Sequence, residues 1–214
     1  MKKIYTAILL AASVQTFAQS NLVPGSKYDQ HKVFEPGFYV EKGNQFRTAG
    51  GAPSAKYWQN HADYQINVVL DTVKKQISGS TLITYTNNSP DGLPFLWLQL
   101  DQNIYRQDSR AEAATPVTGG RFANKDFTQG DMIKSVTLIR NGKAEAANYL
   151  VTDTRMQIKL RDSLKASGNK IQIKIDYSFE IPENGTDRMG RQHTSDGWIY
   201  EIAQWYPRME VYDD

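Results

Sequence analysis

The stretch KIQIKIDYSFEI, residues 170–181, decides the fold of this 214-residue chain. Every second residue in it is apolar, and the set is Ile171, Ile173, Ile175, Tyr177, Phe179 and Ile181. A period of two places these side chains on one face of a half-buried β-strand. Pro182 follows directly. Proline cannot donate to a sheet ladder, so we expect the strand to end there.

The same period of two recurs on the N-terminal side of this stretch. The alternating positions are Tyr64, Ile66, Val68 and Leu70, then Ile77, Thr81, Ile83 and Tyr85, and later Met156, Ile158 and Leu160. Residues 95–100 are more densely apolar, which predicts a strand buried on both faces. Val136 and Leu138 lead into Asn141-Gly142, a strong signal for a two-residue hairpin turn.

Helical periodicity is weak along the whole chain, and we expect at most a single turn at residues 162–165. Two long polar stretches, residues 106–131 and 183–197, are expected to be loops. Loops of this length are either functional or mobile, or simply solvated insertions. Repeated short strands between turns predict an all-β fold, either a β-sandwich or saddle-shaped sheets.

The N-terminus has the pattern of a signal peptide. Lys2 and Lys3 precede an apolar run over residues 4–14, and Thr16-Phe17-Ala18 has small residues where a signal peptidase cleaves. The run is shorter than the roughly 20 residues that a membrane-spanning helix needs. We therefore predict a signal peptide over residues 1–18, an extended or mobile leader over 19–56, and an ordered domain over 57–214.

Charge and cysteine content narrow the function classes. Without the two lysines of the predicted signal peptide, the chain has as many basic as acidic residues, and no basic block is present. Nucleic-acid binding needs a surplus of basic charge, so nucleic acid is not an expected partner. The chain has no cysteine, which excludes disulfides, thiol catalysis and thiolate metal sites. These features fit an exported protein of a Gram-negative bacterium, periplasmic or extracellular.

Motifs of common catalytic sites are absent from the sequence. The three histidines, His31, His61 and His193, have no second histidine four residues away, as a zinc-binding His-Glu-x-x-His helix requires. We expect His61 and Asp63 to form a surface pair beside a strand. There is no Gly-x-Ser-x-Gly elbow and no phosphate-binding loop. Four carboxylates lie near one another in sequence, namely Glu180, Glu183, Asp196 and Glu201. Two of them could form a catalytic pair for glycoside hydrolysis. The simpler alternative is that they solvate the edge of a sheet.

The segment WIYEIAQWYPRM, residues 198–209, is rich in aromatic residues. Tyr and Trp suit both a packed sheet edge and a ligand-facing surface. The given sequence ends soon afterwards at Asp213-Asp214. A bare sheet edge at a terminus is a liability, so we expect the polypeptide to continue.

In order and spacing, several motifs resemble the N-terminal domain of bacterial zinc peptidases of the aminopeptidase N family. The opening is YWQNHADYQI at residues 57–66, followed by Leu70-Asp71, Gly79 and the NNSPD turn at 87–91. The leucine-rich strand LWLQL at 96–100 and Asn103 come next. Residues 168–182 and AQWYPR at 203–208 complete the resemblance, which covers roughly residues 57–214.

The resemblance implies a β-saddle that packs on a thermolysin-like zinc domain. In that family a Gln or Glu of the N-terminal domain helps to hold the free amino group of the peptide substrate. Gln204 is the position that we match to this role, with Glu201 as a rival, and a buried structural glutamine is the alternative. Amide and carboxylate oxygens can accept hydrogen bonds from an ammonium group.

The catalytic motifs of the family are absent from the 214 residues. These are the Gly-x-Met-Glu-Asn strand, the His-Glu-x-x-His helix and the downstream Glu ligand. The resemblance therefore implies the N-terminal, non-catalytic portion of an exported zinc aminopeptidase, with zinc and peptide bound by a domain outside this sequence. We expect this chain alone to bind no metal and to lack catalytic residues. The alternative is a stand-alone β-sandwich module for binding or docking, without enzymatic activity.

Overall fold

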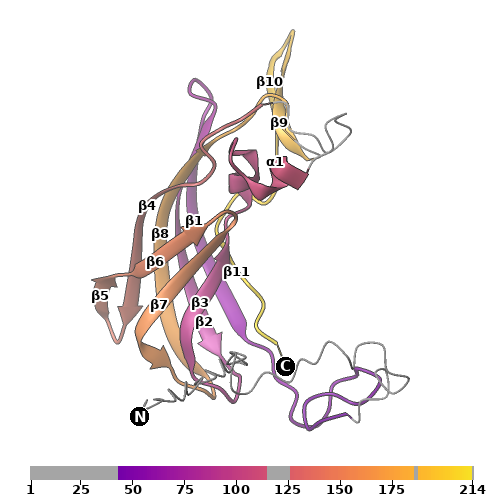
Figure 1. Cartoon of the computed structure of the whole chain (residues 1–214). Helices are drawn as coiled ribbons and strands as arrows, with labels where there is room; N and C mark the ends of the chain where they lie inside the picture. The colour runs from indigo at the N-terminus through magenta and orange to yellow at the C-terminus, as the bar shows by residue number, and fades with distance from the viewer. Residues whose placement is uncertain (1–42, 115–125, 186–187, 214) are drawn as a thin grey trace, which may run out of the picture.

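The computed structural model describes residues 43–114, 126–185 and 188–213, and this part of the chain is all-β with antiparallel pairing throughout (Figure 1). The larger sheet has five strands in the order β1-β2-β8-β4-β5. They are β1 (His61–Asp71), β2 (Gln76–Asn87), β8 (Asn169–Glu180), β4 (Met132–Arg140) and β5 (Lys143–Ala146). The all-β prediction is confirmed.

A four-stranded sheet packs against the larger one, in the order β11-β3-β7-β6. Its strands are β11 (Arg208–Met209), β3 (Leu93–Gln99), β7 (Arg155–Leu164) and β6 (Asn148–Thr152). A separate hairpin consists of β9 (Met189–Thr194) and β10 (Gly197–Ile202). Two short helical segments follow β3, namely the 3-10 helix η2 (Asp101–Tyr105) and α1 (Arg110–Ala114). In Figure 1 the hairpin and α1 lie at the end of the molecule where the long strands extend beyond the four-stranded sheet.

The core lies between the two sheets. Strand β8 contributes the predicted alternating face, and Ile173, Ile175, Tyr177 and Phe179 are fully buried. Leu96 and Leu98 of β3 and Met156 and Ile158 of β7 belong to the same buried cluster. Apolar burial of this kind is the main stabilising contribution to the fold.

Gly79 of β2 lies opposite Tyr177 of β8 in the ladder. A Cβ atom at Gly79 would lie 2.6 Å from the Cζ atom of Tyr177. The glycine therefore leaves the space that the buried tyrosine ring occupies, a common reason for glycine inside a strand. The ring is fully buried, and burial raises the pKa of Tyr177 to about 12.

The predicted Asn141-Gly142 turn is confirmed. It joins β4 to β5, and both residues have positive φ angles, 49° and 75°. This is the backbone conformation that a two-residue hairpin loop of the favoured type requires.

Four local predictions are wrong. Residues 95–100 are not buried on both faces, because Phe95 is 42% exposed and Trp97 is 37% exposed on the outer side of β3. Residues 162–165 form no helical turn, because β7 continues through Leu164. The stretch 183–197 is not one loop, since it contains β9. Residues 106–131 include the short helix α1, for which the sequence has no clear periodic signal.

Strand β1 is only partly the half-buried strand that its pattern predicts. Tyr64 and Ile66 are half-buried, whereas Val68 and Leu70 are 45% and 39% exposed. The strand lies at the edge of the larger sheet, and its second half extends past the four-stranded sheet (Figure 1). The second half of the alternation therefore has little to pack against.

The predicted signal peptide and residues 19–42 of the predicted leader lie outside the described residues. Residues 43–56 form tight turns with a bridge between Arg47 and Pro53. The boundary at residue 57 stays a prediction. None of the helices in the described ranges is long and apolar enough to cross a membrane.

Candidate functional site

The turn that carries Gln204 connects hairpin β9–β10 to strand β11. Gln204 has a φ angle of 45°, in the left-handed region that non-glycine residues seldom adopt. Its residue surface is exposed, and its side-chain amide forms no hydrogen bond with any residue in the described ranges. Strained backbone at an exposed polar residue is often found at functional sites.

The buried side chain of Gln102 forms hydrogen bonds with the backbone of this turn. Gln102, in η2, is only 2% exposed. Its Nε2 donates a hydrogen bond of 2.9 Å to the carbonyl oxygen of Gln204 and a longer one of 3.4 Å to that of Ala203. The oxygen Oε1 of Gln102 is buried and has no partner among the described residues. The backbone of the turn is thus fixed while the side chain of Gln204 remains free.

The two neighbours of Gln102 in η2 anchor further segments. The carboxylate of Asp101 accepts two hydrogen bonds from Arg208, 2.6 Å from Nη2 and 3.1 Å from Nε. The side chain of Asn103 donates to the carbonyl of Asp153 at 2.7 Å and accepts from the backbone N–H of Asp131 at 2.8 Å. The run Asp101-Gln102-Asn103 therefore links the Gln204 turn, β11 and the segments before β4 and β7.

Asp131 is a buried carboxyl group beside this run. Its Oδ1 atom is out of contact with solvent and has no hydrogen-bond partner among the described residues, although part of the residue remains exposed. Burial raises the pKa of Asp131 to about 7, a shift that the nearby negative charge of Asp101 reinforces and a hydrogen bond from the backbone of Gln102 reduces. The carboxyl therefore titrates near neutral pH.

Aromatic side chains support the other side of the turn. The ring of Tyr206 contacts Trp205 and Tyr64 edge-on, with centroid distances of 5.1 and 5.6 Å. The hydroxyl of Tyr64 accepts a hydrogen bond of 2.9 Å from the backbone N–H of Met209. Trp205 and Tyr206 are half-buried and pack against the core, so much of this aromatic-rich segment is structural.

Glu201, the rival of Gln204, lies in different surroundings. It is exposed in β10, opposite Gly190 of β9, and it lines a polar depression of about 660 Å³ together with Arg188 and His193. Gln204 does not line this depression. The structure therefore does not bring the two candidate residues together in one pocket.

The carboxylates considered for glycoside hydrolysis are partly engaged with Arg191. Glu180 and Glu183 lie 3.9 and 4.0 Å from its guanidinium nitrogens, and Arg191 also donates to the carbonyl oxygen of Ile181. These contacts attach β9 to the end of β8.

Cation–π contacts attach the same hairpin to the β1–β2 turn. The Nζ atom of Lys75 lies 4.1 Å from the ring centroid of Trp198, and the guanidinium carbon of Arg191 lies 5.9 Å from it. The ring of His193 contacts Trp198 edge-on at 5.0 Å. Trp198 of β10 therefore contacts the β1–β2 turn through Lys75 and the other strand of its own hairpin through Arg191 and His193.

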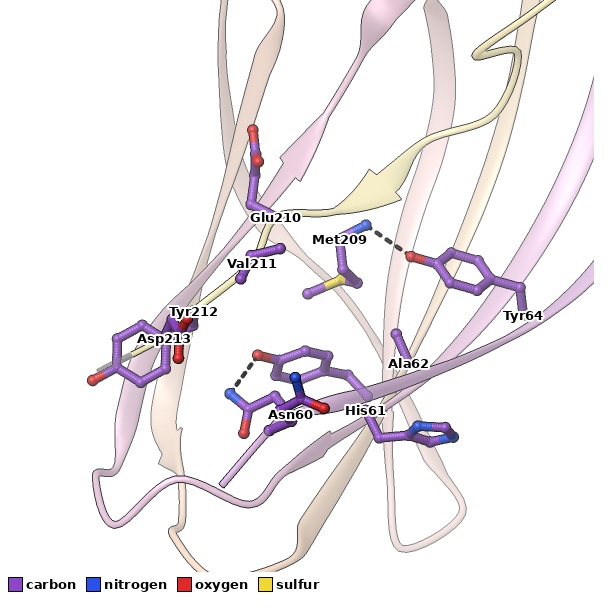
Figure 2. Close-up of a pocket in the computed structure, with 11 residues that line it drawn as sticks. Asn60, His61, Ala62, Tyr64, Met209, Glu210, Val211, Tyr212 and Asp213 are labelled. Carbon is purple, nitrogen blue, oxygen red and sulfur yellow. Dashed lines mark hydrogen bonds between the residues drawn. The ribbon is translucent and has the colours of Figure 1, made fainter. Parts of the chain in front are cut away.

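A separate hollow of about 290 Å³ lies between the start of β1 and the segment Met209–Asp213 (Figure 2). Several polar groups that line it form hydrogen bonds within the protein. Tyr64 accepts from Met209, and the side chain of Asn60 donates to the hydroxyl of Tyr85 at 2.8 Å. The imidazole of His61 points away from the hollow. The hollow therefore lies where the segment Met209–Asp213 packs along β1, at the edge of the larger sheet.

The two histidines in the described ranges, His61 and His193, are exposed surface residues. His61 and Asp63 form the predicted exposed pair, with 2.9 Å between Nε2 and Oδ1. His31 lies outside the described residues. Within residues 43–114, 126–185 and 188–213, no group of three or more His, Asp or Glu side chains is arranged to hold a metal ion.

Sequence reasoning missed Gln102 and Asp131. The available signal was weak but present, because Asp101-Gln102-Asn103 is a polar run directly after an apolar strand, yet its members are largely buried. Buried polar residues need hydrogen-bond partners, and those partners come from segments distant in sequence.

The described part of the chain is thus an all-β domain with an amide-bearing turn held on a buried polar run. No family model matches the chain, and a comparison with curated proteins finds no match. Among solved structures, it is similar to a mutant two-domain M1 zinc metallopeptidase bound to L-tryptophan, at 14% identity and a TM-score of 0.38, covering 64% of this chain and 24% of that one.

It is also similar to an M1 zinc metallopeptidase from Deinococcus radiodurans, at 14% identity and a TM-score of 0.37, covering 62% of this chain and 23% of that one. A mutant of the Deinococcus radiodurans protein bound to a Tyr-Ser-Ala substrate shows 12% identity and a TM-score of 0.38, covering 70% and 30%. The chain thus spans between about a quarter and a third of the length of these structures. Similarity at this level does not determine its function.

Proposed function

We propose that this chain is the N-terminal, non-catalytic portion of an exported zinc aminopeptidase, and that the side chain of Gln204 receives the amino group of the peptide substrate. Zinc and the water that attacks the peptide bond belong, in this proposal, to a catalytic domain outside the 214 residues. The predicted signal peptide supports export to the periplasm or the cell exterior.

The observation that carries the proposal is that the side chain of Gln204 is exposed on a restrained backbone. Its amide is exposed and has no partner among the described residues, whereas its backbone is fixed by the buried Gln102. A glutamine buried for a structural role would be expected to use its amide within the protein, whereas the exposed amide of Gln204 is accessible to a ligand. The exposed amide adds to the sequence motifs at residues 57–66, 87–103 and 203–208.

The chemistry of the side chain suits an ammonium group. The side-chain carbonyl oxygen of a glutamine, Oε1, can accept hydrogen bonds from an ammonium group. A hydrogen bond to a charged partner contributes about 1.5–3 kcal/mol, more than one between neutral groups. Glu201 lines the polar depression of the hairpin and is the less favoured candidate, because no comparable support fixes it in a turn.

The first test is to determine the coding DNA in frame beyond codon 214 and to express the complete open reading frame. We expect a His-Glu-x-x-His sequence with a later Glu, and hydrolysis of aminoacyl anilides that a chelator abolishes and zinc restores. A coding sequence without these motifs, or a complete protein without this activity, contradicts the proposal.

The matched comparison uses two variants of the complete protein. Gln204→Ala should raise KM for aminoacyl anilides about tenfold, the equivalent of about 1.4 kcal/mol, with kcat little changed. Glu201→Ala should leave KM within about twofold. If Glu201→Ala has the larger effect, the site assignment is reversed. Purified residues 19–214 should show no chelator-sensitive hydrolysis in the same assay.

One observation favours the alternative of a stand-alone docking module. Phe95, Trp97 and Val211 are exposed, and all three line a mainly apolar hollow of about 210 Å³ between β3 and the segment 209–212. Exposed apolar groups that gather on one face can mark an interaction surface. A complete gene product without peptidase motifs that is soluble and monodisperse as expressed, and in which Trp97→Ser abolishes capture of a specific protein, would favour this function.

A further inference from the structure

We propose that Gln102 is the positioning residue for Gln204, so that its buried carboxamide sets the direction in which the exposed amide of Gln204 points. The amine-binding role of Gln204 rests on the proposed function, but the restraint of its turn by Gln102 can be tested independently. Apart from its place in the polar run that follows an apolar strand, the sequence does not mark Gln102, since its partners lie about one hundred residues away.

The first supporting observation is geometric. One amide nitrogen lies within hydrogen-bond distance of two successive carbonyls, those of Ala203 and Gln204, at 3.4 and 2.9 Å. The two carbonyls belong to the peptide units on either side of the Cα atom of Gln204, so the two contacts together restrain its φ and ψ angles. The direction of the Gln204 side chain depends on these angles, because the Cα–Cβ bond has a fixed geometry relative to its own backbone.

The second observation is the backbone conformation at Gln204. A non-glycine residue in the left-handed region costs of order 1–3 kcal/mol and persists only when its surroundings enforce it. The φ angle of 45° therefore requires a restraint. Gln102 supplies the contact to the carbonyl of this residue itself, whereas the neighbouring N–H of Ala203 donates to the carbonyl of Arg188 at 3.2 Å.

The third observation separates Gln102 from its neighbour Asp101. Asp101 pairs with Arg208, four residues after Gln204, and the Arg208 side chain is 41% exposed. An ion pair with that much solvent contact is weakened by water and salt. The side chain of Gln102 is only 2% exposed, so its amide donor is less open to water than the guanidinium of Arg208, although the carbonyls that it contacts are partly buried rather than fully buried. We therefore assign the positioning role to Gln102 and a supporting role to the Asp101–Arg208 pair.

The decisive variant is Gln102→Met, which keeps the length of the side chain and removes the donor. Gln102→Asn is the second variant, because it keeps an amide but is one carbon too short to reach both carbonyls. The matched control is Gln172→Met in β8, whose amide donates, among the described residues, only to the hydroxyl of Thr84 in the β2–β8 ladder, at 3.3 Å.

The first measurement is amide hydrogen exchange on residues 19–214, resolved by segment. Gln102→Met should raise exchange of the amides at residues 202–206 at least tenfold, with the β2 and β8 amides within about twofold of the parent chain. Gln172→Met should not change the turn. Unchanged exchange at 202–206 in both Gln102 variants overturns the proposal, as does loosening of the whole sheet with no excess at the turn.

The second measurement is steady-state kinetics on the complete protein with an aminoacyl anilide. Gln102→Met should raise KM about fivefold with kcat within about twofold. The double variant Gln102→Met/Gln204→Ala should be no worse than Gln204→Ala alone, because positioning has no effect once the positioned amide is gone. Independent, multiplicative effects of the two changes overturn the positioning role, since a general loss of stability would act in that way.

The two failures can be told apart. If Gln204→Ala leaves KM unchanged while Gln102→Met loosens the turn, the amine-binding role of Gln204 is wrong and the restraint by Gln102 stands. If Gln204→Ala raises KM while Gln102→Met changes neither exchange nor KM, the proposed function stands and the positioning role is wrong.

Discussion

Strand β8 and the Gln204 turn are organised by opposite means. In β8 the side chains on one face are fully buried, and apolar packing against the second sheet fixes the strand. At the turn, single polar contacts from Gln102 and Asp101 restrain an exposed segment. The strand is thus stabilised by many redundant contacts, whereas the conformation of the turn depends on a few side chains.

The largest expected effect is in β8. Ile173→Ala should reduce the free energy of unfolding by about 2–5 kcal/mol, because it removes buried methyl groups and leaves a cavity. Ile173 is fully buried between the sheets. Urea denaturation measures the change, and the exposed Lys170→Ala on the same strand should stay within about 0.5 kcal/mol. Equal effects of the two variants would contradict the sandwich core.

The next effect concerns the buried carboxyl beside the turn. The pKa of Asp131 is raised from 3.8 to about 7 by burial, so the folded state holds this proton more tightly than the unfolded state. Its stabilising contribution is full below about pH 4 and is lost as pH rises to about 7, a change on the order of 2–4 kcal/mol.

Asp131→Asn should remove this dependence and be more stable than the parent chain at pH 8, as measured by urea denaturation between pH 4 and 8. Asp71, Asp108 and Asp176 have lowered pKa values, chiefly because hydrogen bonds to backbone or side-chain donors favour their charged forms. Their contributions act below about pH 4 and are common to both proteins. Parallel stability curves for the two proteins would show that Asp131 titrates normally.

A smaller effect is expected at Gly79 of β2, which lies opposite Tyr177 of β8. Gly79→Ala should cost about 1–3 kcal/mol by overpacking, because the new methyl carbon would lie 2.6 Å from the ring. Gly92→Ala is the control, since the nearest atom to its new carbon would be 3.8 Å away. Calorimetric unfolding compares the two, and a neutral Gly79→Ala would mean that the tyrosine ring can move aside.

The smallest expected effect is at the hairpin. Trp198→Leu removes the ring over which Lys75 lies, and a cation–π contact at an exposed site contributes about 0.5–1 kcal/mol. Global stability should change by no more than that, while limited proteolysis within residues 189–202 should become faster. Ile199→Ala, at a residue that is 58% exposed, should change neither quantity. A large loss of global stability would place the hairpin within the core.

The fold class could be predicted because alternation encodes burial locally. The pattern from Ile171 to Phe179 and the Asn141-Gly142 turn each depend on neighbours in sequence. The same reasoning failed for Phe95 and Trp97, because an apolar residue on a strand does not reveal whether a second sheet covers that face. It also failed for residues 183–197, where polar strands form a hairpin through backbone bonds and cation–π contacts.

By itself, the sequence determined the long strands of the two sheets, the position of several turns and the absence of cysteine chemistry, since these depend on composition and local period. Only the tertiary structure decided that Gln102 lies beneath Gln204, that Asp131 is buried beside Asp101, and that Glu201 lies apart from Gln204. Those relations join residues separated by up to about one hundred positions, and such contacts arise only when the sheets pack and polar groups find partners in the interior.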